Sequence, residues 1–280
     1  MQKIESVPDM QAEVTRLKRA GRTVALVPTM GALHAGHEAL IAVARERADV
    51  VVVSAFVNPL ALGPSENFAG YPRDAGADAA ACGRLKVDML FTPAAEEMFP
   101  RGYSTFVTEE VVSKPLCGIS RPMHFRGVTT LLTKLFNIVR PDVLVMGQRD
   151  AQQIAVVRKM LADLCFTAEI VVAPIVREPD GLAVSVRNRD LASYQRQDAV
   201  AIYAALQRAR AMVADGVRSP DRIIAEATHL LGERRRVRVI YIAIVDPATM
   251  EPMREVVPGR SLMAIAAWVD EVRLIDNTLL

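Results

Sequence analysis

The feature that most constrains the fold is a repeated alternation of short apolar segments with segments of helical periodicity. It runs through the first two thirds of the 280-residue chain. Strands are expected at residues 23–27, 50–57, 87–92, 143–146 and 170–172, and helices at residues 37–48, 75–85, 128–139 and 151–164. Residues 50–57 are apolar at nearly every position, which is typical of a strand buried on both faces. The alternation predicts an α/β fold with a parallel sheet and helices on both of its faces.

The last third of the chain has a different order of elements. Helices are expected at residues 190–214 and 221–231, and strands at residues 237–245, 262–268 and 272–275. Turn-forming residues at positions 179–181 separate this part from the rest. We therefore predict a first domain of residues 1–180 and a smaller α+β domain of residues 181–280.

Charge and composition exclude several classes of partner. The chain has 34 Lys and Arg against 32 Asp and Glu, a net charge of +2, and only 5% aromatic residues. Neither a nucleic acid nor a membrane surface is expected as a partner.

The longest apolar stretch, residues 50–57, falls far short of the roughly 20 residues of a membrane span. Residues 1–10 have no apolar signal-peptide core, and the three widely spaced cysteines indicate reduced thiols in or near the core of a cytoplasmic protein.

The strongest motif lies at residues 28–37, Pro-Thr-Met-Gly-Ala-Leu-His-Ala-Gly-His, between an expected strand and an expected helix. The first backbone N–H groups of a helix are unpaired and bind phosphate well. Gly31 and Gly36 allow the backbone to approach a ligand, and His34 and His37 fall on one side of the first turn. This is similar to the nucleotidyl-transfer motif of class I aminoacyl-tRNA synthetases and of small cytidylyl- and adenylyltransferases. The alternatives are two histidines without a ligand, or a zinc site, for which no third ligand lies nearby.

A second polar segment follows the expected strand at residues 143–146. Gly147 permits close approach to a ligand, and Arg149 offers a fixed positive charge. Asp150 is expected either to bind ribose hydroxyls or to cap the following helix. Gln152 and Gln153 point about 100° apart on a helix, so at most one of them should face a site.

Three further segments admit two interpretations each. Ser185 and Arg187 are suited to gripping a phosphate, or they belong to a solvated loop with a capping serine. Asn58 follows the most apolar strand, where it orients a polar substrate or forms an Asn-Pro turn. The two arginines and the histidine of residues 120–127 line the mouth of a site or grip neighbouring carbonyl groups.

Taken in order along the chain, these blocks resemble the pantothenate synthetase (pantoate–β-alanine ligase) family. The matching blocks are VALVPTMGALHAGH, VVVSAFVNP, YPRD, SRPMHFRGV, TKLFNIVRPD and RLIDN. The resemblance implies a Rossmann-like nucleotidyltransferase domain, a smaller C-terminal lid domain and a homodimer. It also implies that ATP, bound with Mg²⁺, activates pantoate as an enzyme-bound acyl-adenylate. Pyrophosphate leaves, and β-alanine then attacks the acyl carbon to give pantothenate and AMP.

The resemblance also implies roles for individual residues. His34, His37 and Arg149 would offset charge at the α-phosphorus as catalytic residues. The implied ATP-binding residues are Met30, Gly36, Gly147, Asp150, Ser185 and Arg187, the implied acid-binding residues are Asn58, Ala61 and Gln153, and no protein metal ligand is expected.

The chain departs from the family within these same blocks. Ala61 and Leu62 stand where the family has Gln and Phe, and Arg149 stands where it has Lys. Ala151 replaces an aromatic residue, and Val186 replaces a serine. A site that lacks a hydrogen bond discriminates differently among acids. Two alternatives therefore stay open: a related ligase that joins another acid or amine, and a non-amide nucleotidyltransferase or weakly catalytic binding homologue.

Overall fold

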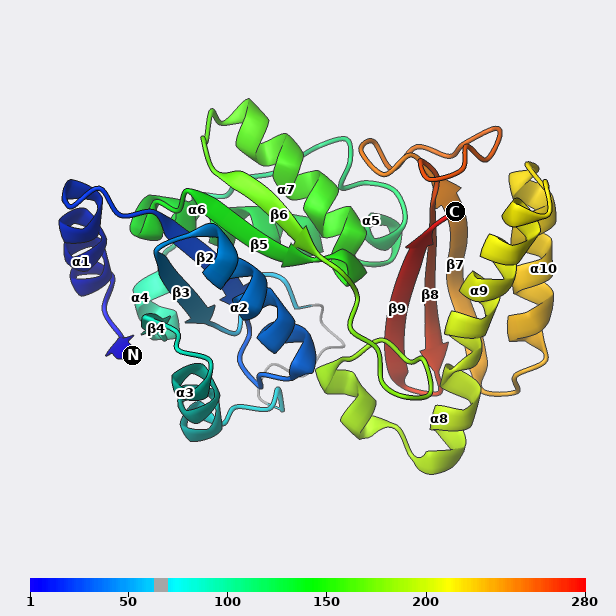
Figure 1. Cartoon of the computed structure of the whole chain (residues 1–280), viewed down its shortest axis with the longest axis horizontal. Coiled ribbons are helices and arrows are strands. Elements are labelled where there is room, and N and C mark those ends of the chain that lie inside the picture. Colours follow the sequence, from blue (N-terminus) through cyan, green and yellow to red (C-terminus); the bar gives the residue numbers. More distant parts are fainter. Residues whose placement is uncertain (63–69) are drawn as a thin grey trace. The chain divides into compact units, whose positions relative to one another are not determined.

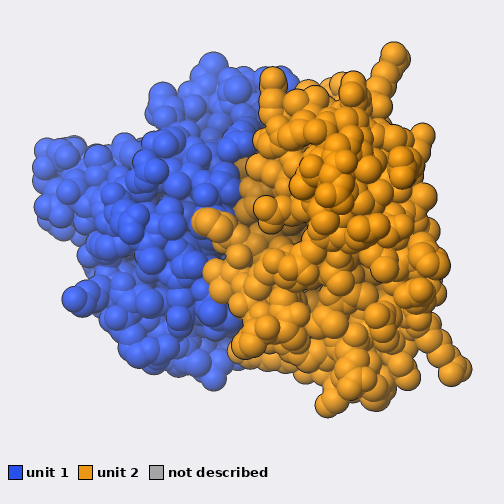
Figure 2. All heavy atoms as spheres, turned by 45° about the vertical axis from the view of Figure 1, so that its right-hand side comes forward, with its two compact units in different colours: residues 1–110, 121–147, 156–173 blue, residues 111–120, 148–155, 174–280 orange. Residues whose placement is uncertain are grey.

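In the computed structural model, which describes residues 1–62 and 70–280, the chain divides into two units (Figure 2). Unit 1 comprises Met1–Glu110, Arg121–Gly147 and Val156–Ala173, and unit 2 comprises Val111–Ser120, Gln148–Ala155 and Pro174–Leu280. These units are groups of residues in mutual contact. The expected domains were instead placed from the order of elements and from a turn in the sequence. The domain boundary at residue 180 therefore remains a prediction.

Unit 1 is built on a parallel sheet of six strands, as the alternation predicted (Figure 1). The strands are β1 (Gln2–Ile4), β2 (Val24–Thr29), β3 (Val50–Ala55), β4 (Met89–Phe91), β5 (Val143–Gly147) and β6 (Glu169–Ala173). Their order in the sheet is β1-β4-β3-β2-β5-β6. From β2 the chain builds outward to β3 and β4 on one side, and it later returns to build β5 and β6 on the other. The carboxyl ends of β2 and β5 therefore form a topological switch point, where ligands bind in folds of this kind.

Helices flank the strands of unit 1. They are α1 (Val7–Arg19), α2 (Ala35–Arg47), α3 (Ala75–Arg84), α4 (Ala95–Met98), α6 (His124–Val139) and α7 (Ala151–Asp163), the last of which also extends into unit 2. Ile41 and Ala44 of α2 pack with Ala25 and Val27 of β2 in one apolar cluster. The alternate β2 residues are also fully buried, so both faces of the sheet are covered.

Two elements at the start of the chain were not expected from the sequence. The first is strand β1, and the second is α1, whose buried residues Met10, Val14 and Leu17 recur at helical spacing. Ser6 caps α1 by accepting a hydrogen bond from the Asp9 N–H at 3.2 Å. The periodicity and the capping serine were thus both readable in the sequence.

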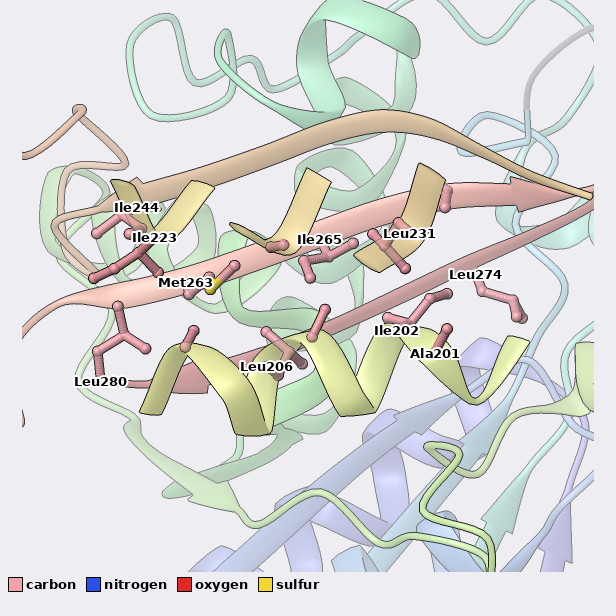
Figure 3. Packing of buried hydrophobic residues seen from close by; sticks show 14 of the residues in the cluster. Ala201, Ile202, Leu206, Ile223, Leu231, Ile244, Met263, Ile265, Leu274 and Leu280 are labelled. Carbon is pink, nitrogen blue, oxygen red and sulfur yellow. The ribbon is translucent and has the colours of Figure 1, made fainter. Parts of the chain in front are cut away.

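Unit 2 contains an antiparallel sheet of three strands, in the order β7-β8-β9. The strands are β7 (Val237–Val245), β8 (Leu262–Val269) and β9 (Val272–Leu279), and the longer helices are α8 (Ser193–Ala199), α9 (Ala201–Ala214) and α10 (Pro220–Gly232). Short helical turns are also present: α5 (Cys117–Ser120), η1 (Gln148–Asp150) and η2 (Val186–Asp190). Figure 3 shows Ile202 and Leu206 of α9 and Ile223 of α10 packing with Met263 and Ile265 of β8 in a single core.

The prediction of one helix over residues 190–214 was wrong. The helical turn η2 occupies residues up to Asp190, and the chain is extended at Leu191. Helix α8 then begins where the Gln195 side chain accepts the Ala192 N–H at 2.8 Å. It ends at Ala199, and a turn at Val200 separates it from α9, although the Val200 N–H still bonds the Arg196 carbonyl at 3.3 Å.

The cysteines differ from the expectation at one position. Cys82 and Cys117 are buried free thiols, but Cys165 is exposed. It follows α7 in a left-handed conformation with φ of 57°, in a turn at the surface. Among the residues that the structure describes, no helix has the length and apolar character needed to span a membrane.

Candidate active site

His34 and His37 form the amino end of α2, directly after β2. The His34 Nδ1 accepts the Gly36 N–H at 3.2 Å, and the His37 Nδ1 accepts the His34 N–H at 3.3 Å. The two rings stack with centroids 3.9 Å apart and an interplanar angle of 19°, which confirms that they share one side of the turn. A neutral imidazole whose Nδ1 accepts a hydrogen bond carries its hydrogen on Nε2. The turn therefore supplies two Nε2–H donors beside the positive end of a helix dipole.

The glycines of this motif are needed by the protein itself. A Cβ at Gly36 would lie 2.9 Å from the His34 Cε1, so any side chain there would displace the capping imidazole. Gly31 has φ of +78°, and a Cβ there would lie 2.8 Å from Oδ2 of Asp78. Asp78 is not part of any motif in the sequence, because it lies on α3, far from the histidines along the chain. Met30, half-buried, occupies the position directly after β2.

Gly147 ends β5, which pairs with β2 in the sheet. Both residue 147 and the histidine turn therefore belong to the carboxyl edge of unit 1, at its switch point. Within the part of the chain that the structure describes, a Cβ at Gly147 would meet only the Leu40 Cδ2, at an ordinary 3.7 Å. The absence of a side chain here is thus not required by packing, which is consistent with a position left open for a ligand.

Asn58 and Ala61 follow β3, and both are buried. The Asn58 Nδ2 donates to the Gly127 carbonyl at 2.9 Å, and its Oδ1 accepts the Leu60 N–H at 3.1 Å. The peptide between Leu60 and Ala61 packs on Gly127, where a Cβ would come within 2.4 Å of the Leu60 carbonyl. Of the two interpretations of Asn58, its hydrogen bonds are those of the turn. A role for Asn58 in acid binding remains a prediction.

The block at residues 120–127 grips this same turn. The Arg121 Nη2 donates to the Ala61 carbonyl at 3.1 Å, and the His124 Nδ1 lies 2.8 Å from the same oxygen. The alternative that these side chains hold a neighbouring carbonyl group is therefore what their contacts show. Their contacts fix the conformation of the chain at the position where the family has glutamine.

In unit 2, Arg149 and Asp150 lie in the helical turn η1. The Arg149 Nη1 donates to the Val184 carbonyl at 2.9 Å, and its Nη2 lies 3.6 Å from the Asp150 Oδ2. The Nε of Arg149 is buried, and no atom of the described residues accepts a hydrogen bond from it. The Arg149 guanidinium is therefore oriented by one backbone oxygen and by one carboxylate at the edge of ion-pair distance. It has further N–H groups that could donate to a ligand.

Ser185 and Arg187 lie at the start of η2 in the same unit. The Ser185 Oγ accepts the Arg187 N–H at 3.3 Å, which is the capping role that was expected as the alternative to phosphate binding. The Arg187 Nη1 donates to the Arg273 carbonyl at 3.3 Å. This contact orients the guanidinium and leaves its phosphate-binding role a prediction.

Gln152 and Gln153 have separate environments. Gln152 is buried, and its amide bonds to the Cys117 N–H at 3.0 Å and to the Pro115 carbonyl at 2.7 Å. These contacts hold the segment Val111–Ser120 to the start of α7. Gln153 is half-buried. Gln152 is thus committed to structure, and Gln153 is the member of the pair that is left for a site.

The described residues contain no group of three His, Cys, Asp or Glu side chains that could hold a metal ion. A parallel sheet with stacked histidines at its switch point defines an α/β protein of the nucleotidyltransferase type.

Comparison with known proteins supports this class and narrows it. The family model for pantoate-beta-alanine ligase matches residues 2–279. The pantothenate synthetase of Thermotoga neapolitana is 46% identical over 280 residues, which cover 100% of both chains. The crystal structure of pantothenate synthetase from Thermus thermophilus superposes with a TM-score of 0.94 at 39% identity, covering 100% of this chain and 99% of that one. A Francisella tularensis pantoate-beta-alanine ligase complexed with beta-gamma ATP and beta-alanine has a TM-score of 0.84 at 29% identity, covering 100% and 97%.

The chain therefore belongs to the pantoate–β-alanine ligase family, and the family prediction is confirmed. It is an enzyme of the class that forms amide bonds.

Proposed function

We propose that the protein joins pantoate to β-alanine at the expense of ATP, through an enzyme-bound pantoyl-adenylate. The observation that carries the proposal is the stacked pair His34 and His37 at the amino end of α2. It provides two imidazole donors and a helix dipole at the switch point between β2 and β5, where the order in which strands are added to the sheet reverses. Family membership over the whole chain supports the same reaction.

In the first step a carboxylate oxygen of the acid attacks the α-phosphorus of ATP, and pyrophosphate leaves. In unit 1, His34 and His37 donate hydrogen bonds to phosphate oxygens as negative charge develops. In unit 2, Arg149 supplies positive charge, and Ser185 and Arg187 bind phosphate. We propose that Mg²⁺ enters with ATP, whose phosphate oxygens are the kind of ligand that this ion prefers.

In the second step the amine of β-alanine attacks the acyl carbon. A C–N bond forms, the C–O bond to the phosphate breaks, and AMP leaves with the electron pair. The attacking nitrogen gives up one proton to solvent water as the amide forms. Alignment of the two reactants is sufficient for this step, because the adenylate is already a good acyl donor.

The oligomeric state and the cellular location are proposed from the family resemblance. We propose a homodimer that acts in the cytoplasm, where ATP is available. Sedimentation equilibrium of the purified protein tests the first point, since a monomer at all concentrations would contradict it.

A second candidate function is a ligase of the same chemistry with a different acid. It is favoured by Ala61, a buried alanine at the position of the family's acid-binding glutamine. An alanine removes both a donor and an acceptor, and a site without them accepts less hydroxylated acids more readily.

The experiment that tests both is ATP–pyrophosphate exchange with a panel of hydroxy and keto acids, followed by mass analysis of products formed with amines. Exchange that depends on pantoate, with pantothenate formed from β-alanine, supports the proposal. Exchange with another acid supports the second candidate. Exchange with no acid would contradict both and leave a binding homologue or a nucleotidyltransferase of another kind.

A further inference from the structure

Asp78 is a buried carboxylate that holds the turn before the histidines. Its side chain lies on α3 and is 6% exposed. Its Oδ2 accepts the Ala32 N–H at 3.0 Å, and its Oδ1 accepts the Leu33 N–H at 2.8 Å. Both carboxylate oxygens are thus bonded to consecutive backbone groups that lie 46 and 45 positions earlier in the chain.

The turn that Asp78 holds has an unusual backbone. Gly31 and Ala32 have φ of 78° and 51°, both in the left-handed region. A residue with a Cβ adopts this region only when its surroundings enforce it. Besides Asp78, the Thr29 Oγ1 accepts the Gly31 N–H at 3.1 Å and donates to the Ser54 carbonyl at 2.8 Å. The left-handed turn is therefore fixed from α3 and from β3.

The direction of this turn decides where the histidines lie. Leu33 directly precedes His34, whose imidazole caps α2 and stacks on His37. If the Leu33 N–H lost its acceptor, the chain would enter α2 at another angle, and the cap would shift with it. A carboxylate repels a nearby phosphate, and the two backbone N–H groups that donate to Asp78 offset part of its negative charge. Here both of its oxygens accept hydrogen bonds from the backbone.

We propose that Asp78 is a positioning residue for adenylation, which holds residues 31–33 in the left-handed turn that orients the Nε2–H groups of His34 and His37. The inference rests on the proposed function, in which these two groups bind the phosphates of ATP. It concerns orientation of the donors and not contact of Asp78 with the substrate.

The main test variant is Asp78→Asn. Asparagine keeps the shape, but its Nδ2 then faces one of the two backbone N–H groups. Two donors cannot form a hydrogen bond with each other, so one of the two contacts is lost. We expect kcat for pyrophosphate exchange to fall about 10- to 100-fold, as for a misplaced catalytic group. The KM for the acid should change less than about twofold, because the residues proposed to bind the acid, Asn58, Ala61 and Gln153, lie outside this turn.

The matched control is Asp49→Asn. Asp49 lies directly before β3, and its side chain bonds Thr23 directly before β2, at the end of that strand away from the histidines. The Asp49 Oδ2 accepts the Thr23 N–H and the Thr23 hydroxyl, each at 2.9 Å. This control removes the same kind of contact from the same strand, away from the histidines. We expect it to change the melting temperature without a comparable loss of kcat.

A second variant keeps the test valid if Asp78→Asn folds poorly. Gly31→Ala places a Cβ against the Asp78 Oδ2 and leaves the carboxylate itself intact. It should lower kcat in the same way, and the double variant should lose little more than the worse single variant, because both changes break one contact.

A spectroscopic readout separates positioning from general destabilisation. Long-range ¹H–¹⁵N correlation of the imidazoles should show the Nε2–H tautomer for His34 and His37 in the parent protein and in Asp49→Asn. It should show a changed tautomer or changed shifts in Asp78→Asn and Gly31→Ala. This measurement needs no substrate, so it tests the inference even if the parent protein exchanges pyrophosphate with none of the acids. Unchanged imidazole signals in both variants, or a loss of kcat no larger than in Asp49→Asn, would overturn it.

Discussion

Asn277 and Gln148 are bonded to each other through both side chain and backbone. The Asn277 Oδ1 accepts from the Gln148 Nε2 at 3.0 Å, and the Asn277 Nδ2 donates to the Gln148 carbonyl at 3.0 Å. The same Nδ2 also donates to the Arg149 carbonyl at 2.9 Å. Asn277, on β9, is 3% exposed. The last strand of unit 2 thereby fixes the turn that carries Arg149.

Asn277→Asp should lower the rate of adenylation, because a carboxylate in that position repels both carbonyl groups and releases the turn. We expect a loss of about 10- to 100-fold in kcat for pyrophosphate exchange. The control is Asn137→Asp, since the Asn137 Nδ2 donates to a single carbonyl at an exposed position of α6. Equal rates in the two variants would show that the hydrogen bonds of Asn277 to the turn that carries Arg149 have no catalytic importance.

His34→Ala should cost both rate and stability, since this imidazole is also the cap of α2. Loss of one oxyanion donor typically lowers kcat about 10²–10³-fold, and loss of a cap costs about 1 kcal/mol. His34→Asn keeps an acceptor for the Gly36 N–H but has no imidazole. We expect it to retain the stability and lose the rate, and His37→Ala to lose a similar rate. Near-normal exchange in His34→Asn would refute the phosphate role.

Arg149→Lys keeps the charge and changes the shape. A guanidinium bonds the Val184 carbonyl through one nitrogen and has donors on two others for a ligand, whereas the donors of an ammonium all lie on a single nitrogen. We expect about a tenfold loss of kcat, equal to one charge-assisted hydrogen bond of about 1.5 kcal/mol. Arg158→Lys, at an exposed position of α7, is the control. A faster reaction with pantoate in Arg149→Lys would mean that the site has not been rebuilt around arginine.

Ala61→Gln tests the acid specificity. If the restored amide finds its hydrogen bond, kcat/KM for pantoate should rise relative to the best alternative acid. The expected gain in transition-state stabilisation is about 1–2 kcal/mol. Ala61 is buried, so the longer side chain also needs room. Ala61→Met has similar length without the amide and separates size from hydrogen bonding. Recovery should be partial, because Leu62 and Val186 are altered as well. A parent enzyme that is already efficient and selective for pantoate would refute the idea of a changed acid pocket.

Thiol reactivity should distinguish the three cysteines. Burial raises the pKa of the Cys82 thiol to about 11, and the Asp78 carboxylate adds to the effect. At pH 8 only about a thousandth of such a thiol is ionised, and the thiolate is the reactive form. Cys117 is buried against Arg273, whose Nη2 lies 3.6 Å from its sulfur. We expect one rapidly labelled thiol in the native protein, absent from Cys165→Ser, and three after unfolding. Rapid labelling of a second native thiol would contradict the burial of Cys82 and Cys117.

The sequence by itself determined the α/β character of unit 1 and the position of the histidine motif at a strand-to-helix turn. These follow from hydrophobic periodicity and from residues within a few positions of one another, which act through local geometry. Strand β7 has the bounds expected from the sequence, Val237–Val245. The break between α8 and α9 was missed, because the apolar periodicity continues across Val200, and so do the backbone hydrogen bonds from Val200 to Arg196 and from Ala204 to Val200.

Only the tertiary structure decided which side chains hold the candidate site in place. Asp78 bonds residues 45 and 46 positions away, and Asn277 bonds a residue 129 positions away. It also decided that Asn58 bonds the Gly127 carbonyl and that Gln152 holds the segment Val111–Ser120. A local pattern cannot predict such contacts. A buried polar group is bonded to whatever backbone the folded chain brings within about 3 Å, and that depends on the order of strands in the sheet.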